Sequence, residues 1–155
     1  MTPVRWLEPD EQAAWRVLLR TTLGLVDRLD AELRAEHDLT FGDYEILAHL
    51  SSGADGRLRM TDLAGRALVS KSRLTHAIAR LEERGLVRRE PDEHDGRGVQ
   101  AALTARGRSL LERAAPTHVD GVRRLLIDQL PEGGVEALVE ALEPVRDGLF
   151  GPPSP

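Results

Sequence analysis

The chain has 155 residues, contains no cysteine and carries a formal net charge of −5 at pH 7. This length suits one domain or one compact two-part unit, and the lack of cysteine excludes disulfides and thiolate metal sites. The N-terminal segment has no apolar run of signal-peptide length, and no segment approaches the ~20 apolar residues that span a bilayer. We therefore expect a cytoplasmic protein.

The charge is unevenly distributed along the chain. Residues 57–108 hold twelve Arg or Lys against seven Asp or Glu, whereas the remainder holds nine against nineteen. A local basic surface attracts a polyanion whatever the mean charge of the protein. The middle of the chain is therefore expected to bind an anionic partner.

The first forty residues predict a long helix, and a shorter helix follows. Apolar positions recur at steps of three and four over residues 10–39, and Pro9 suits a first turn. These positions are Trp15, Leu18, Leu19, Thr22, Leu25, Val26, Leu29 and Leu33. Residues 40–53 predict the shorter helix, with Thr40 as its N-cap and Gly53 at its end. Its expected core positions are Tyr44, Leu47 and Leu50.

The middle of the chain predicts two further helices. A turn and a strand stub in residues 53–60 precede a small helix over residues 61–68, with Thr61 as its cap. A longer helix over residues 71–87 follows, capped by Ser70. The expected core positions of the pair are Leu63, Ala64, Leu68, Leu74, Ile78 and Leu81.

Two helices are expected at the C-terminal end. Thr104 opens a long helix that Pro131 stops, and Pro116 should kink it because proline removes one backbone hydrogen bond. The last helix spans about residues 132–149, with one apolar face. The tail, residues 151–155, should be frayed.

A predicted hairpin after the two middle helices decides the fold class. Residues 86–104 form two extended arms around a turn rich in proline and glycine. The terminal helices have more apolar face than a small central unit covers. We predict a mostly α fold with a small β-hairpin wing, in which a winged helix-turn-helix lobe is joined to terminal helices that form a homodimer interface. The expected divisions are residues 1–36 (N-terminal dimerisation helix), 37–106 (DNA-binding lobe), 107–150 (C-terminal dimerisation helices) and 151–155 (flexible tail).

The helix over residues 71–87 has an outer face suited to DNA. This face is small, polar or basic, and it has no carboxylate before Glu82. Such a face offers donors to phosphates and base edges, and free amides at the helix N-terminus can hold a phosphate. The candidate contacts are Ser70, Lys71, Ser72, Arg73, Thr75, His76 and Arg80, with Arg88 and Arg89 continuing the basic surface onto the hairpin. For this helix taken alone, an ordinary solvent-facing helix is the alternative.

These segments resemble the MarR family of bacterial transcription regulators. The resemblance rests on "LAGRALVSKSRLTHAIARLEERGLVRRE", on the following "DEHDGRG" and "ALTARG", and on the helix order, and it covers nearly the whole chain. It implies a homodimer with interlocked terminal helices and two winged lobes that grip a pseudo-palindromic operator. It also implies, commonly, release from DNA when a small aromatic or phenolic ligand binds.

The wing tip departs from the family's pattern, which reads approximately Asp-x-Arg-Asp-x-Arg. His94 stands where the first arginine would be. The resemblance implies that Arg97 enters the minor groove and that Asp95 holds its guanidinium. His94 is open to three interpretations: a phosphate contact, a modest pH dependence, or an inert exposed side chain. We hypothesise that Asp92 and Glu93 limit non-specific binding to phosphate.

Catalysis and metal binding have little support in the sequence. No two of the five histidines lie at i, i+4 within a helix, and no His-Glu-x-x-His pattern occurs. No P-loop, Rossmann or Gly-x-Ser-x-Gly pattern is present either. We predict no enzyme activity, no cofactor and no metal.

A ligand pocket is harder to assign. The resemblance places it between the dimer helices and the DNA-binding lobe. The candidates are Trp15, Arg16, Leu19, Arg20, His37, Phe41 and Tyr44, the arginines serving a carboxylate. Core packing is the simpler account of Trp15, Leu19 and Tyr44, because they lie on apolar stripes.

The sequence thus predicts a homodimeric DNA-binding transcription regulator, a repressor, whose partners are double-stranded DNA, a second copy and a small aromatic ligand. The alternative from another class is a helical protein–protein adaptor that uses the winged lobe without specific DNA binding. Retention on specific genomic sequences would separate the two. An orphan regulator without a ligand also remains open.

Overall fold

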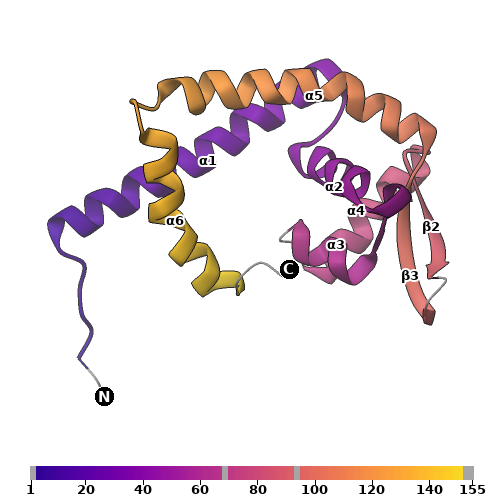
Figure 1. Ribbon diagram of the computed structural model, residues 1–155, viewed down its shortest axis with the longest axis horizontal. Helices are drawn as coiled ribbons and strands as arrows, with labels where there is room; N and C mark the ends of the chain where they lie inside the picture. The colour runs from indigo at the N-terminus through magenta and orange to yellow at the C-terminus, as the bar shows by residue number, and fades with distance from the viewer. Residues whose placement is uncertain (1–2, 68–69, 93–94, 152–155) are drawn as a thin grey trace.

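Two long helices lie against each other and carry a small winged lobe at one end (Figure 1). The computed structural model describes residues 3–67, 70–92 and 95–151, without the side chains of 95–97. The elements in chain order are α1 (Pro9–His37), α2 (Phe41–Ser52), a 3-10 turn (Ala54–Gly56), β1 (Arg57–Arg59), α3 (Met60–Arg66), α4 (Lys71–Glu83), β2 (Val87–Asp92), β3 (Asp95–Leu103), α5 (Ala105–Leu125), a second 3-10 turn (Ile127–Gln129) and α6 (Gly134–Phe150). In the described part of the chain, no helix is both long and apolar enough to cross a membrane.

The starts of α1, α2 and α4 lie where the sequence predicted them. Pro9 occupies the first turn of α1. The Thr40 hydroxyl accepts a hydrogen bond from the Asp43 amide at 2.9 Å, and the Ser70 hydroxyl accepts one from the Arg73 amide at 3.3 Å. Each cap satisfies an amide that has no partner within its own helix, which fixes where the helix begins.

Two predicted boundaries in the lobe are wrong. The first helix of the pair, α3, starts at Met60 after Arg59, so Thr61 lies inside its first turn and does not cap it. Pairing of β1 with β3 extends the backbone as far as Arg59, and the helix begins directly after it. The second helix, α4, ends at Glu83 instead of continuing to residue 87, because Gly85 adopts a φ of +69° and turns the chain into β2.

The C-terminal helices also differ from their predicted bounds. Helix α5 continues through Pro116 and ends at Leu125, after which a 3-10 turn leads to Pro131. Helix α6 begins at Gly134, because Gly133 before it has a φ of +72° outside the helical range.

The sheet has three antiparallel strands in the order β1-β3-β2. In register, Arg57 pairs with Ala102, which pairs with Arg88 on the other side. Successive residues of a strand point to opposite faces of a sheet. Val87, Ala101 and Leu103 therefore point toward the core, where all three are buried.

The core lies within the lobe and extends to the lobe end of the long helices. The predicted core positions of α2 and α4 are confirmed, and both described positions of α3 are buried; Leu68 lies outside the described residues. The largest fully buried side chains are Leu33, Leu39, Leu47, Leu50, Leu63, Leu74, Ile78, Leu81, Leu86 and Val87. They come from α1, α2, α3, α4, β2 and the loops between them, so one core positions the α3–α4 pair and the wing together.

The junction between α4 and β2 meets the start of α5. The Thr104 hydroxyl donates to the Gly85 carbonyl oxygen at 2.8 Å, and the Thr104 amide donates to the Leu86 carbonyl oxygen at 3.1 Å. The same hydroxyl accepts from the Gly107 amide at 3.0 Å and so caps α5. Gly107 packs so closely that a Cβ atom there would lie 2.1 Å from the Leu86 oxygen. The Leu-Thr-x-x-Gly segment and the Gly-Leu-Val segment therefore pack directly against each other.

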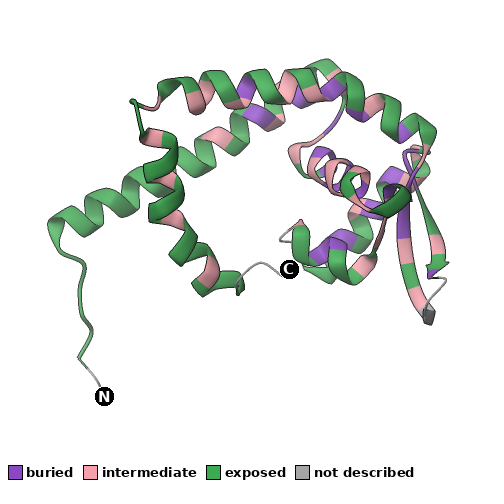
Figure 2. Ribbon diagram, in the orientation of Figure 1, coloured by how far each residue is buried: buried purple, intermediate pink, exposed green. Residues whose placement is uncertain are grey.

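No residue in the outer half of α1 or in α6 is fully buried in a single chain, although a few are half-buried (Figure 2). On α1 only Leu29 and Leu33 are buried, whereas Trp15 is 53% exposed. The other exposed apolar residues on these elements include Val17, Leu18, Leu19, Leu23, Val26, Val135, Val139, Val145, Leu149 and Phe150. An exposed apolar surface of this extent marks an interaction site.

Candidate nucleic-acid interface

The free face of α4 carries most of the predicted recognition residues. Lys71, Ser72, Arg73, Thr75 and His76 are all exposed. The N-cap hydroxyl and the Thr75 hydroxyl, which donates to the Lys71 carbonyl oxygen at 2.8 Å, are engaged within the helix. Lys71, Arg73 and His76 are the basic donors of this face, and no carboxylate lies among them.

Arg80 has a protein partner that the sequence did not reveal. Its Nη2 donates to the Asp43 Oδ1 of α2 at 2.9 Å, and the Asp43 side chain is only 5% exposed. One turn further along α4, the Arg84 Nη2 donates to the carbonyl oxygen of Asp38 at 2.8 Å. Arg80 holds α4 against the start of α2, and Arg84 holds the end of α4 against the segment that joins α1 to α2.

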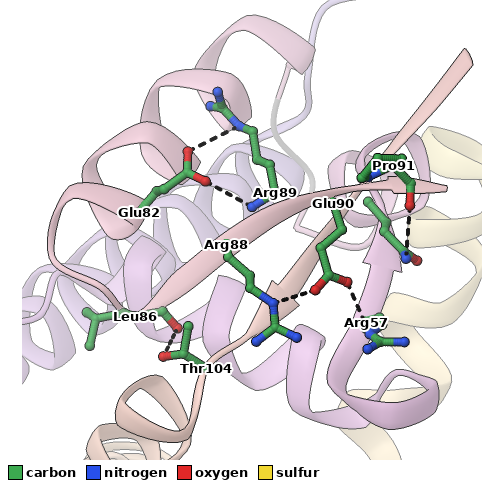
Figure 3. A network of polar contacts seen from close by, with 9 residues as sticks. Arg57, Glu82, Leu86, Arg88, Arg89, Glu90, Pro91 and Thr104 are labelled. Carbon is green, nitrogen blue, oxygen red and sulfur yellow. Dashed lines mark hydrogen bonds and ion pairs between the residues drawn. The ribbon is translucent and has the colours of Figure 1, made fainter.

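Arg88 and Arg89 lie on opposite faces of the wing. The Arg89 guanidinium turns toward α4, where its Nη2 donates to the Thr75 carbonyl oxygen at 3.0 Å. The Arg89 amide donates to a Glu82 carboxylate oxygen at 2.9 Å, as Figure 3 shows. Arg88 instead pairs with Glu90 on the other face. Only Arg89 therefore extends the basic surface of α4, and Glu82 partly neutralises it.

The wing-tip predictions lie outside what the structure describes. His94 is not among the described residues, and nothing is described of the side chains of Asp95 and Arg97. Their proposed roles stay predictions. Asp92, in contrast, is described: it is 5% exposed and pairs with Arg59 of β1.

Hollows flank α4 on two sides. A groove of about 560 Å³ runs between α2, α3 and α4, and a smaller one of about 320 Å³ lies between α3, α4 and the wing. Four basic side chains line the larger groove: Arg66, Arg73, His76 and Arg80. Arg66 was missed in the sequence, where a lone arginine at the end of a short helix gives no distinguishing signal. The outer stripe of α4 thus projects between two depressions, as a helix that enters a DNA groove requires.

The predicted ligand-pocket residues divide into two groups. His37, Phe41 and Tyr44 gather near α5: the His37 Nε2 lies 2.8 Å from the Thr117 hydroxyl, and the Tyr44 ring centroid lies 4.4 Å from that of His118. The others, Trp15, Arg16, Leu19 and Arg20, are exposed on the outer half of α1. At 1.5 Å per residue, Leu19 lies about 27 Å along the helix from His37, so one chain does not bring the groups together.

Comparison with known proteins agrees with this arrangement. A family model described as "MarR family" matches residues 37–98. The structure superposes on AbsC, a MarR family transcriptional regulator from Streptomyces coelicolor, with a TM-score of 0.91, 44% identity, and coverage of 96% of this chain and 100% of AbsC. The chain belongs to the MarR family. The MarR resemblance and the winged-helix fold predicted from the sequence are confirmed.

Two other similar proteins are named as transcriptional regulators. Sco3205, a MarR family regulator from Streptomyces coelicolor solved in complex with DNA, is 40% identical over 96% of this chain and 93% of its own, with a TM-score of 0.91. The transcriptional regulator PecS of Dickeya dadantii is 32% identical over 66% of this chain. This chain spans about three fifths of the length of the curated relatives it matches first. The family consists of transcription regulators and not of enzymes.

His118 of this MarR-family chain is an unpredicted feature of the α2–α5 contact. It stacks on Tyr44 and lies 6.0 Å from the Phe41 ring, centroid to centroid. Its Nδ1 is buried, and no hydrogen-bond partner for it occurs in the part of the chain that the structure describes. Burial lowers the pKa of His118 below its ordinary value, which the nearby Glu45 carboxylate opposes. Burial also raises the pKa of Tyr44.

Stability should depend on pH through His118. Because its pKa is lower in the folded chain, the unfolded chain takes up the proton more readily. The contribution of neutral His118 to the free energy of unfolding is thus complete above the ordinary pKa of 6.5 and is lost as pH falls below it. Urea unfolding at fixed protein concentration should show that the free energy of unfolding falls less between pH 7.5 and pH 5.5 in His118→Phe than in wild type. Equal losses in both proteins would contradict this role.

No metal centre emerges from the geometry. Within residues 3–67, 70–92 and 95–151, no three His, Asp or Glu side chains are grouped so that they could hold an ion.

Proposed function

We propose that this MarR-family chain is a homodimeric repressor that binds a pseudo-palindromic operator in cytoplasmic DNA. The observation that carries the proposal is the outer face of α4, where exposed Lys71, Arg73 and His76 stand without a carboxylate. Such a face can enter the major groove and donate to base edges and phosphates. The DNA complex of Sco3205 supports DNA as the partner.

Dimerisation is the second part of the proposal. The outer half of α1 and the whole of α6 expose apolar side chains in the single chain, and a second copy is the occupant that would bury both. The sequence division into residues 1–36 and 107–150 for dimerisation and 37–106 for DNA binding follows the same logic. A two-fold dimer should hold its two α4 helices about 34–36 Å apart, so that they meet successive major grooves.

A small aromatic ligand that releases DNA is the third part. His37, Phe41 and Tyr44 lie where α1, α2 and α5 meet, and a second copy could bring Trp15, Arg16, Leu19 and Arg20 to the same region. Thermal unfolding in a panel of phenolic acids tests this, because a ligand that binds only the folded state raises the melting temperature. No shift with any member at millimolar concentration would favour an orphan regulator.

The decisive test of function is retention on DNA. Sheared genomic DNA passed over the immobilised full-length protein should yield fragments that share a short inverted repeat. Competition with excess unrelated DNA should leave these fragments bound, because specific sites bind about 10³–10⁷ times more tightly than non-specific DNA. Recovery without any shared sequence would favour the protein–protein adaptor.

Arg97 is expected to matter for the outer part of each half-site. Arg97→Ala should weaken operator binding and reduce the preference for A/T pairs there, because narrow A-tract minor grooves attract arginine. Gel-shift titrations of operators with A/T or G/C outer positions measure this preference. Arg113→Ala on α5 serves as the control. If Arg97→Ala binds both duplexes as wild type does, Arg97 is not the minor-groove residue.

A further inference from the structure

Ion pairs lie on the outer face of the wing, which is the face of the sheet that points away from α4. Glu90 accepts a hydrogen bond from Arg88 and lies 3.3 Å from the Arg57 Nε (Figure 3). Two residues further along β2, Asp92 pairs with Arg59. Each carboxylate of β2 thus meets an arginine of β1, although β3 lies between these strands.

The Arg57–Glu90 pair crosses β3 beside a small residue, Ala102. Neighbouring strands lie about 4.8 Å apart, so β1 and β2 are separated by roughly 9.6 Å. Ala102, which pairs in register with Arg57 and Arg88, offers only a methyl group between them, and it is 1% exposed. Long guanidinium side chains can therefore reach over β3 to Glu90.

Asp92 pairs in register with Asp95, where β3 begins. It is the last residue of β2, and the strand register shifts between Pro91 and Asp92. Such an irregularity redirects a strand. The Asp92 side chain is only 4% exposed. A buried carboxylate is costly without a cationic partner, so the ion pair with Arg59 fixes this residue relative to β1.

We propose that Asp92 and Glu90 are positioning residues for DNA binding, which tie β2 to β1 and set the direction of the wing tip. The inference rests on the proposed function, because it presumes that the tip enters a minor groove. It also replaces the hypothesis that Asp92 limits non-specific binding. A repelling surface charge and a positioning carboxylate predict opposite effects on operator binding when the charge is removed.

The test compares full-length variants that lose one negative charge. Asp92→Asn and Glu90→Gln alter the outer-face pairs, and Glu112→Gln, at an exposed position on α5, changes the charge equally elsewhere. Fluorescence anisotropy follows binding to three duplexes: the recovered operator, the same operator with G/C at its outer positions, and an unrelated sequence. Asp92→Asn should bind the operator at least about fivefold more weakly, the size of one mismatched base pair, and should lose A/T preference. Its binding to the unrelated duplex should match that of Glu112→Gln.

If Asp92→Asn does not fold, the double variant Arg59→Gln/Asp92→Asn replaces it. This variant removes both charges and leaves no unpaired carboxylate, and it should show the same loss of operator affinity. Variants that bind all three duplexes more tightly, in step with Glu112→Gln, would overturn the positioning role. The positioning role would also be overturned if the slope of log affinity against log salt concentration were smaller by about 0.9 in Arg59→Gln, since Arg59 would then contact a phosphate. Wild-type protein with no preference for the operator would overturn the proposed function itself.

Discussion

Gly107→Ala should destabilise the protein by about 3 kcal/mol or more, at the upper end of the usual cost of overpacking. The added methyl carbon would lie 2.1 Å from the Leu86 carbonyl oxygen and 2.8 Å from the Leu103 Cδ1. The oxygen cannot move away freely, because it accepts a hydrogen bond from the Thr104 amide at 3.1 Å. Urea unfolding of the variant at the same protein concentration measures the loss.

Gly65→Ala is the matched control for this substitution. Gly65 also lies in a helix of the lobe, but a Cβ atom there meets no neighbour within 4 Å. Alanine should stabilise that helix by up to about 1 kcal/mol, the difference in helix propensity between the two residues. If Gly107→Ala were as stable as Gly65→Ala, the packing of α5 on the α4–β2 junction would be described wrongly.

Arg73→Glu should weaken operator binding by about 100-fold or more while leaving the fold intact. Arg73 is exposed on α4 and lines the larger groove beside it. One good arginine contact with a base is worth about 1–3 kcal/mol, and a carboxylate at the same place adds repulsion from the phosphates. Anisotropy titration on the recovered operator measures the loss, and thermal unfolding verifies the fold.

Arg113→Glu provides the comparison for Arg73→Glu. Arg113 is exposed on α5, outside the lobe, and its substitution changes the net charge by the same amount. It should reduce affinity only slightly, through the long-range field. Equal losses for both variants would mean that net charge governs binding, and α4 would lose its special role.

Local signals in the sequence predicted much of this fold. Thr40 and Ser70 cap their helices as expected, and the spacing of Leu74, Ile78 and Leu81 identified the buried side of α4. These features depend on residues within one or two turns of each other, so a local pattern contains them. The start of α3 was missed because β1 pairing, a long-range contact, sets it.

The site was less predictable than the fold because its contacts join distant segments. Arg80 had no visible reason to pair with Asp43, 37 residues away, until α2 and α4 were packed together. The direction of Arg88 depends on strand register, since a shift by one residue moves a side chain to the other face. Similarly, the apolar stripe of α1 predicts burial, but a single chain leaves Trp15 exposed.

The acidic residues of the wing show the same limit. From the sequence we hypothesised that Asp92 and Glu93 limit binding to phosphate. In the structure Asp92 is buried against Arg59 and Glu90 lies beside two arginines, whereas Glu93 lies outside the described residues. Arg57 lies 33 residues before Glu90 in the chain and Arg59 lies 33 before Asp92, so the pairing follows only from the β1-β3-β2 order.

The most direct test of the account is the affinity of the wild-type protein for its recovered operator and for an unrelated duplex, measured from 50 to 300 mM salt. Each phosphate contact adds about 0.9 to the log–log slope, so both affinities should fall steeply with salt. At every salt concentration the protein should bind the operator at least about 10³-fold more tightly than the unrelated duplex. A flat salt response, or equal binding of both duplexes, would contradict the assignment of α4 and the wing to sequence-specific DNA recognition.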